Sequence, residues 1–388
     1  MKYRLLDLLK DPTDGTRLRV VAATERQVAF DRELNSVACT QFCGLKNRPL
    51  VEANVTAEDC QRCYAREIIA GDLVSEGGHR HVISGGIPRL FSQATSDWVQ
   101  KNQSTFSLEW KNFKFGERNW GQDIEYRKDL FLRGIGRRPD ELRGKIIFDA
   151  GCGSGALSIA LAESFDMEVV ALDLAFGIEQ AYAHNTNPFV HFVQGSVVEP
   201  PVREESVDYL YCAGVLVHIQ HARSGFDALK PTLKPGGRYM IWMYHPIDER
   251  HHPDDRLKMT VYNWIRTYVT SPLPIQMQHA LYLAAIPFFV LKREVGNLLS
   301  REKNTTTWRE KVQDLTDMFS PVYQHRFTEE EIIGWFESDH FENATLAYQE
   351  QYGFAARGDK TVRTLGRTVT GRAGDAGTTI RPSVRASA

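Results

Sequence analysis

One strand and the turn after it constrain the fold of this chain more than any other segment. Residues 145–155 form an apolar run that ends in Asp149 and continues into glycines at positions 151, 153 and 155. The residues that follow, 156–162, have helical character. Glycine lets a backbone turn sharply and approach a ligand closely, and the amino end of a helix favours electronegative groups. The sequence therefore predicts an α/β unit that holds a small ligand at this turn.

Two kinds of ligand suit a glycine turn of this type. Gly151, Gly153 and Ala156 fit the loose pattern of dinucleotide-binding turns, which leaves a nicotinamide oxidoreductase as an alternative. Asp149 and Gly155 extend the pattern to D-x-G-x-G-x-G. A carboxylate here would repel a pyrophosphate but attract the ammonium and sulfonium charges of S-adenosylmethionine. We therefore expect S-adenosylmethionine as the cofactor.

Further strand segments continue this pattern in order, at residues 168–173, 191–195, 207–212 and 233–242. Asp173 ends the first of them, where a carboxylate can accept both ribose hydroxyls. The series resembles class I S-adenosylmethionine-dependent methyltransferases. The resemblance implies a doubly wound, seven-stranded α/β sheet whose last strand is antiparallel. It also implies a set of cofactor-binding residues, in which Ser196 stands where the family often has an acid: Asp149, Gly151, Cys152, Gly153, Gly155, Asp173, Leu174, Gly195, Ser196, Val197 and Ala213.

Four of the six cysteines form two close pairs. Cys39 and Cys43 are separated by sixteen residues from Cys60 and Cys63. This spacing favours a structural zinc ion bound by all four, with unligated thiols as the alternative. This part of the chain resembles the small zinc-ribbon family that activates methyltransferases, at residues 5–12, 67–74 and 83–90. The family's usual cysteine pairs would fall at residues 11–15 and 75–79, where this chain has no cysteine. We therefore expect residues 1–95 to form a zinc-ribbon-like β domain.

The remaining chain divides into four parts. Residues 96–140 are rich in aromatic side chains, which we expect to pack in the core or to cover the cofactor: Phe106, Trp110, Phe113, Phe115, Trp120 and Tyr126. Residues 141–246 and 322–360 are expected to form the methyltransferase core, and 247–321 a helical insertion. The apolar patch at 280–291 is too short to span a bilayer, so we expect a buried helix; a cover for the site, an apolar substrate site and a peripheral membrane contact are alternatives. Residues 361–388 have few large apolar side chains, which predicts a disordered tail.

The expected reaction is methyl transfer to a small-molecule, sugar or lipid acceptor, most simply through oxygen. A hydroxyl acceptor needs a general base, and His218 and His245 follow the fourth and fifth strand segments, with Tyr244 as a third choice. A net charge of −2 without a basic stripe argues against a nucleic-acid substrate. A non-catalytic cofactor-binding module, and an enzyme acting on nucleic acid or protein, are alternatives. Charged residues interrupt the first apolar run, so we expect no signal peptide and a cytoplasmic location.

Overall fold

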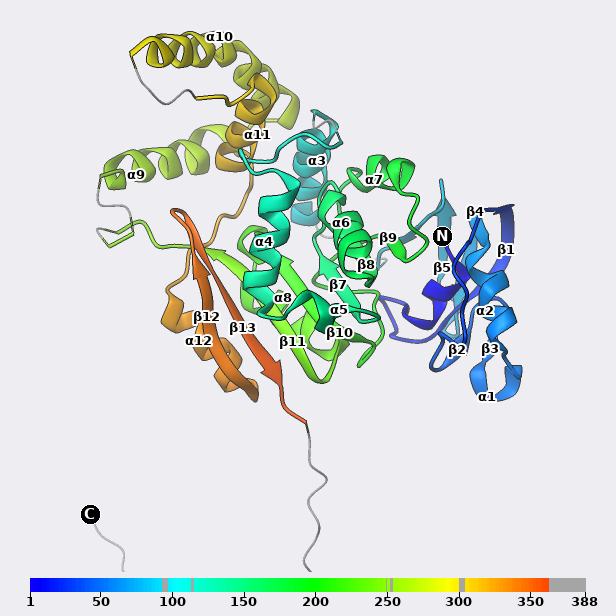
Figure 1. Ribbon diagram of the computed structural model, residues 1–388. Helices are drawn as coiled ribbons and strands as arrows, with labels where there is room; N and C mark the ends of the chain where they lie inside the picture. Colours follow the sequence, from blue (N-terminus) through cyan, green and yellow to red (C-terminus); the bar gives the residue numbers. More distant parts are fainter. Residues whose placement is uncertain (93–96, 113–114, 249, 252–253, 300–303, 363–388) are drawn as a thin grey trace, which may run out of the picture.

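The computed structural model describes residues 1–92, 97–112, 115–248, 250–251, 254–299 and 304–362. Its main feature is one sheet of eleven strands in the order β1-β4-β5-β6-β9-β8-β7-β10-β11-β13-β12, with helices on both faces of its central part (Figure 1). Among the described residues, four strands of this sheet belong to the amino-terminal part and are continuous with the strands that follow residue 140. Phe113 and residues 363–388, which we assigned to the aromatic segment and the tail, lie outside the described residues.

The central part of the sheet contains the predicted core. Its strands are β7 (Ile146–Ala150), β8 (Glu168–Asp173), β9 (Val190–Gly195), β10 (Val207–Ala213), β11 (Leu233–Tyr244), β12 (Phe341–Gln349) and β13 (Gly353–Lys360). Strands β7 to β11 pair in parallel, and β13 lies between β11 and β12, antiparallel to both. Strand β9 is buried along its whole length, as expected for a parallel sheet covered on both faces.

Helices connect these strands and cover the sheet. They are α4 (Ile124–Ile135), α5 (Pro139–Leu142), α6 (Ala156–Phe165), α7 (Ile178–His184), α8 (Ala222–Leu229) and α12 (Glu329–Ser338), with short 3-10 helices η2 (Leu216–His218) and η3 (Lys230–Thr232). Thr328 caps α12, because its side chain accepts a hydrogen bond from the Glu331 backbone N–H. Gly136, in the left-handed conformation, ends α4.

The amino-terminal part extends the same sheet. Its elements are η1 (Tyr3–Asp7), β1 (Leu18–Gln27), β2 (Phe42–Cys43), β3 (Arg48–Pro49), α1 (Leu50–Ala53), α2 (Ala57–Tyr64), β4 (Arg66–Ser75), β5 (Arg80–Ser84) and β6 (Ile87–Leu90). Strand β6 pairs in parallel with β9, placing Leu90 opposite Gly195. A Cβ atom at Gly195 would lie 2.8 Å from the Leu90 carbonyl oxygen, so this pairing requires a residue without a side chain.

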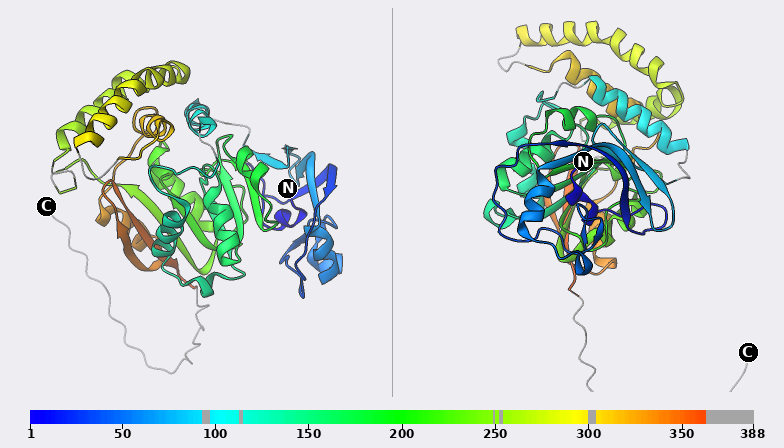
Figure 2. Two further views of the ribbon diagram at one scale, coloured as in Figure 1. Left: turned by 45° about the horizontal axis from the view of Figure 1, so that its top comes forward. Right: turned by 90° about the vertical axis from the view of Figure 1, so that its right-hand side faces the viewer.

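A helical group lies at one end of the sheet (Figures 1 and 2). It contains α3 (Asp97–Asn112), α9 (Arg256–Ile265), the π-helix η4 (Arg266–Thr270), α10 (Ile275–Leu299) and α11 (Trp308–Phe319). Helix α11 packs against α3, α9 and α10. The expectation of a buried helix at 280–291 is wrong, because Phe288 and Leu291 of α10 are 66% and 64% exposed, and only one face of the helix meets α11 and α3. Among the described helices, none combines the length and apolar character needed to cross a membrane.

Candidate functional site

The glycine turn after β7 has the backbone conformation that its sequence predicts. Gly151 and Gly153 have φ angles of +91° and +58°, in the left-handed region that favours glycine. A Cβ atom at Gly151 would lie 2.2 Å from the Val215 side chain. Gly155 then precedes the first residue of α6. The turn therefore brings bare backbone to the carboxyl end of the sheet, next to β8 and β10.

Two buried carboxylates flank this turn. Asp149 accepts a hydrogen bond from the Ser158 hydroxyl (2.6 Å), and Asp173 accepts hydrogen bonds from the backbone N–H groups of Gly153 (2.7 Å) and Ala175 (2.8 Å). Burial raises the pKa of Asp149 to about 6, and burial together with the charge of Asp149 raises the pKa of Asp173 to about 6. The two acids thus lie close enough for the charge of Asp149 to affect Asp173, and a bound cation would favour their ionised forms.

The other predicted cofactor residues surround the same end of the sheet. The Leu174 carbonyl follows β8 and accepts hydrogen bonds from the side-chain amides of Gln103 and Gln194. Gly195 and Ala213 end β9 and β10. Val197 is buried in the hydrophobic core. Ser196 and Cys152 lie beside these strand ends. The Ser196 hydroxyl accepts a hydrogen bond from the Val198 backbone N–H. Cys152 has a buried thiol, and burial raises its pKa.

Aromatic residues of α3 contact the glycine turn and the end of β10. The Trp110 ring lies 2.5 Å from the position that a Cβ atom at Gly153 would occupy, and its Cβ atom lies 2.7 Å from the equivalent position at Gly177. Trp110 also makes an edge-to-face contact with Trp120. Phe106, one turn earlier in α3, packs on the ring of His218 (5.3 Å between centroids). Helix α3 therefore connects the glycine turn with the end of β10.

His218 belongs to a second cluster, at the end of β10. Its Nδ1 lies 3.0 Å from the Tyr323 carbonyl oxygen, and its Nε2 lies 3.4 Å from a carboxylate oxygen of Asp317 in α11. The Tyr244 hydroxyl, at the end of β11, donates to the other oxygen of Asp317 (2.8 Å). Burial and the Asp317 charge raise the pKa of Tyr244 well above its usual value. Tyr244 is therefore a hydrogen-bond donor here, and it holds the Asp317 carboxylate that lies beside His218.

Glu109 lies between the two clusters. It is buried in α3 and accepts a long hydrogen bond from Gln313 of α11 (3.4 Å). Burial, followed by the charge of Asp317 and then that of Asp173, raises the pKa of Glu109 well above its usual value. Sequence reasoning missed both Glu109 and Asp317, because neither lies in a strand-end motif. Only the contact between α3 and α11 makes them neighbours of the cofactor and base residues.

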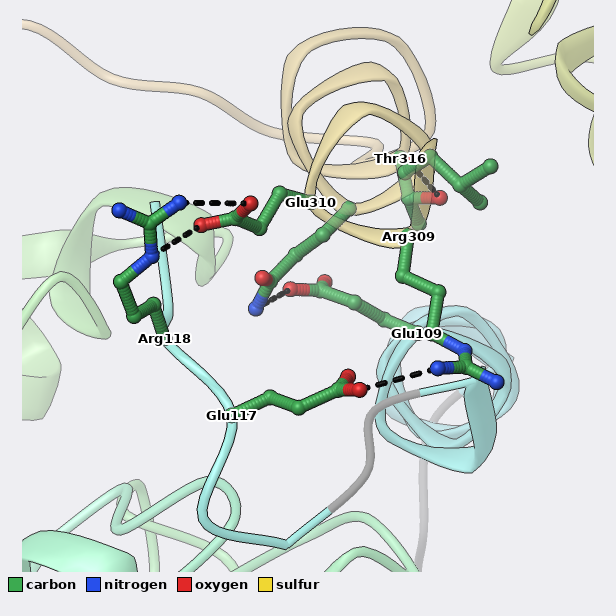
Figure 3. Close-up of a pocket in the computed structure, with 8 residues that line it drawn as sticks. Glu109, Glu117, Arg118, Arg309, Glu310 and Thr316 are labelled. Carbon is green, nitrogen blue, oxygen red and sulfur yellow. Dashed lines mark hydrogen bonds and ion pairs between the residues drawn. The ribbon is translucent and has the colours of Figure 1, made fainter. Parts of the chain in front are cut away.

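A small pocket opens beside Glu109, between α3 and α11 (Figure 3). The ion pairs Arg118–Glu310 and Arg309–Glu117 bridge its walls, as the close-up shows. Its free volume of about 10 Å³ admits about one water molecule. An acceptor does not fit this space, so we do not assign it as an acceptor site.

The second predicted base lies in a different environment. His245 follows β11 directly, but its Nδ1 lies 3.7 Å from Glu329 and its ring stacks on His251 (4.3 Å between centroids). Successive side chains of a strand point to opposite faces, which separates His245 from Tyr244. Of the two predicted bases, the structure brings His218 beside Asp317 and places His245 in another cluster.

The four paired cysteines are close together but do not form a compact ligand set. All four are buried, and burial, followed by the charges of the other three thiols, raises the pKa of Cys63. A tetrahedral zinc ion with bonds of about 2.3 Å holds its sulfur atoms about 3.8 Å apart. Among the described residues, the groups with three ligand atoms within 4.8 Å of one another are Asp11–Asp14–His79 and His245–His251–Glu329, and the cysteines belong to neither. As they lie, the thiols do not fit a closed zinc site.

Comparison with known proteins identifies the domain around the glycine turn. Residues 148–241 match the family model of the methyltransferase domain. An O-methyltransferase of Aspergillus nomiae is 30% identical over 123 residues, 30% of this chain and 55% of that protein. Phosphoethanolamine N-methyltransferase 3 of Arabidopsis thaliana is 29% identical over 116 residues, 29% of this chain and 23% of that protein. The chain thus spans about half or less of the length of these relatives.

Solved structures show more distant similarity. A complex of the Haloferax volcanii Trm112 methyltransferase activator with a methyltransferase matches 62% of this chain and 94% of that chain at 14% identity, with a TM-score of 0.37. A Burkholderia thailandensis 1,6-didemethyltoxoflavin-N1-methyltransferase with bound S-adenosylhomocysteine matches 73% of this chain and 96% of that chain at 14% identity, with a TM-score of 0.36. Scores this low add nothing to the domain match.

Proposed function

We propose that this chain is an S-adenosylmethionine-dependent methyltransferase that methylates a small-molecule, sugar or lipid acceptor, most simply at oxygen. The general assignment as a methyltransferase rests on the match of residues 148–241 to the methyltransferase domain and on the α/β sheet that contains them. The observation that carries the proposal is the pair of buried carboxylates, Asp149 and Asp173, on either side of the glycine turn.

The residues at this turn fit a cationic nucleoside. Two carboxylates with pKa values near 6, and no ion pair to either among the described residues, gain from a nearby positive charge. Asp173 would accept hydrogen bonds from the ribose, and the backbone at Gly153 would lie against the bound molecule. Trp110 covers this backbone, so cofactor entry requires the side chain to adjust. S-adenosylmethionine supplies a methyl group activated by its sulfonium charge.

His218 is the proposed general base. If its Nδ1–H donates to the Tyr323 carbonyl, Nε2 keeps a lone pair, but this nitrogen also faces the Asp317 carboxylate, so an acceptor hydroxyl has to reach Nε2 beside that carboxylate to give up its proton. The Asp317 carboxylate, 3.4 Å away and held by the Tyr244 hydroxyl, stabilises the imidazolium that forms. This arrangement favours an oxygen acceptor, because a hydroxyl must lose its proton when it is methylated.

The acceptor atom is the finer part of the proposal. Proteins similar to this chain are named as methyltransferases acting at oxygen, on phosphoethanolamine nitrogen and at carbon 24 of a sterol. They therefore do not select one acceptor, and the preference for oxygen rests on His218. A cofactor-binding module without catalysis, and a protein or nucleic-acid methyltransferase, are the competing functions.

Calorimetric titration with S-adenosylmethionine and S-adenosylhomocysteine tests the proposal. We expect both to bind the wild type, Asp173→Asn to weaken binding at least tenfold, and reduced nicotinamide dinucleotide to give no signal. An acceptor screen with radiolabelled methyl donor then separates an enzyme from a binding module. Binding without methyl transfer to any alcohol, sugar, lipid, protein or nucleic acid would favour the binding module.

The amino-terminal part carries two further proposals. We propose that residues 1–95 correspond to the zinc-ribbon-like domain and that β9-β8-β7-β10-β11-β13-β12 forms the seven-stranded core of the family. We also propose a structural zinc ion at Cys39, Cys43, Cys60 and Cys63, which requires the thiols to move closer together than they lie here. Metal analysis of purified protein tests this: Cys60→Ser should contain about one zinc per chain fewer than the wild type. An equal zinc content in both proteins would refute it.

A further inference from the structure

A compact group of two histidines and a glutamate lies outside the sites described above. His245 follows β11, His251 lies six residues further on, and Glu329 opens α12. One ligand atom from each lies within 4.8 Å of the other two. His245 and Glu329 are buried, and the two imidazole rings are stacked with 19° between their planes. Both rings lie beside the same carboxylate, that of Glu329.

The distances fit a metal ion. Glu329 Oε1 lies 3.3 Å from His251 Nε2 and 3.7 Å from His245 Nδ1. A tetrahedral ion with bonds of about 2.1 Å separates its ligand atoms by about 3.4 Å. Each of these two pairs would therefore need to move by only a few tenths of an ångström, and the ligand atoms of the two histidines lie within 4.8 Å of each other. Two histidines and one carboxylate are a common ligand set for zinc and related divalent transition metals.

The surrounding side chains orient the same ligand atoms. Asp248 Oδ1 lies 2.8 Å from His251 Nδ1, so this nitrogen donates to the carboxylate and the Nε2 atom faces Glu329. Gln349 donates to Glu329 Oε1 (2.7 Å). A histidine ligand commonly donates its other ring N–H to a carboxylate, which fixes the ring and raises its basicity. Asp248 has that relation to His251.

The charges at the group call for a cation. Nδ1 of His251 carries the hydrogen that it donates to Asp248, so in the neutral ring Nε2 has only a lone pair. This lone pair faces the Glu329 carboxylate, and the two acceptors repel unless a proton or a metal ion lies between them. Glu329 Oε2 is buried and accepts no hydrogen bond among the described residues. The Arg250 guanidinium lies 3.8 Å from it, but this side chain is mostly exposed and also lies beside Glu330. A metal ion, unlike a proton on His251, would bind the carboxylate and both imidazoles together.

We propose that His245, His251 and Glu329 bind a divalent transition metal ion, with zinc as the expected occupant. The ion would tie the segment that leaves β11 to the first turn of α12, and so anchor the start of the helical insertion to the core. The site is independent of the paired cysteines and of the proposed methyl transfer.

Titration of the full-length protein, first stripped of metal with a chelator, tests this site. Zinc binding is followed by calorimetry and cobalt(II) binding by visible absorption, which distinguishes nitrogen and oxygen ligands from thiolates. We expect His251→Ala and Glu329→Gln each to bind one equivalent of metal fewer than the wild type. The lost equivalent should be the one whose cobalt spectrum indicates nitrogen and oxygen ligands. Asp248→Asn leaves the ligands in place and should weaken binding about 10–100-fold. Zinc should raise the melting temperature of the wild type but not that of Glu329→Gln.

Two matched variants control for general effects of the substitutions. His221→Ala removes an exposed histidine, and Glu331→Gln changes an exposed glutamate of the same helix. Both should keep the wild-type equivalents and affinity. Equal metal binding in the wild type, His251→Ala and Asp248→Asn would overturn the proposal and leave a protonated His251 between Asp248 and Glu329. A wild-type cobalt spectrum of thiolate type alone would also overturn it.

Discussion

Affinity for S-adenosylmethionine should depend steeply on pH, because the two carboxylates at the glycine turn must ionise to bind a cation. Burial raises the pKa of both Asp149 and Asp173 to about 6 in the unliganded protein. A bound positive charge lowers these pKa values, so binding releases protons and becomes tighter as the pH rises through 6. Above about pH 7 both acids are ionised and the affinity should level off.

The size of the effect follows from the ionised fraction. For a group with a pKa of about 6, this fraction rises from about 0.1 at pH 5 to about 0.9 at pH 7, or about ninefold. If both acids must ionise, the dissociation constant should fall by up to about 80-fold over this range, which is about 2.6 kcal/mol. Asp149 and Asp173 influence each other, so the titration belongs to the pair.

Isothermal titration between pH 5 and 7, in two buffers of different ionisation enthalpy, measures both affinity and proton release. Asp149→Asn should reduce the pH dependence to about tenfold or less, since it removes one ionisation and also lowers the pKa of Asp173. Asp166→Asn, the same change at the end of α6, is the control and should keep the wild-type profile. A flat affinity in the wild type, or an unchanged slope in Asp149→Asn, would refute the reasoning.

Three further predictions concern the base, the amino-terminal contact and the buried glutamate. His218→Asn should lower kcat by about 10²–10⁴ while the dissociation constant of S-adenosylhomocysteine, by calorimetry, stays within about twofold. Arg4→Met should destabilise the protein by about 3–5 kcal/mol in urea unfolding, because it leaves Glu168 buried without its ion-pair partner at 3.1 Å. Glu109→Gln should raise the melting temperature relative to the wild type more at pH 8 than at pH 5, because the raised pKa of Glu109 makes its ionisation costly to the folded state.

Each of these three predictions has an outcome that would contradict it. Equal losses of kcat and cofactor affinity in His218→Asn would show a structural role. For Arg4→Met, the direction of the pH dependence of stability follows from the pKa of Glu168. Burial alone would raise this pKa, but the charge of Arg4 and the contact with His191 lower it to about 2. The stability from this pairing is therefore present above about pH 4.5 and is lost as the pH falls toward 2, so an Arg4→Met deficit that persists unchanged at pH 2 would contradict the account. A melting-temperature gain in Glu109→Gln that is equal at both pH values would show that Glu109 does not titrate in this range.

The sequence was sufficient to predict the positions of residues that belong to one local pattern. Strand β7, its terminal Asp149 and the glycine turn form one continuous motif, and Asp173 lies at the end of the next strand. Parallel strands bring their carboxyl ends to one edge, so the meeting of these two acids follows from the order of elements alone. The same logic placed His218 at the end of β10, near this edge.

Residues whose roles depend on packing between distant segments could not be found in this way. Asp317 lies about a hundred residues after His218, on a helix of the insertion, and only the packing of α11 brings its carboxylate to the imidazole. The same limit explains the error at α10. Its apolar composition is compatible with burial, but a buried helix also needs a packing partner on each face. The sequence does not show how many faces of α10 pack against another element.

The continuity of the sheet changes how the amino-terminal part relates to the cofactor site. Arg89 of β6 donates to the Gln194 side chain (2.7 Å), and Gln194 in turn donates to the Leu174 carbonyl (3.0 Å), beside Asp173. The backbone of Gly195 pairs with Leu90. A boundary near residue 95 therefore divides the sequence but not the hydrogen-bonded sheet. Removing the amino-terminal part would expose the edge of β9 and remove the Arg89 contact of Gln194, so this edge of the sheet depends on residues that are about a hundred positions earlier in the chain.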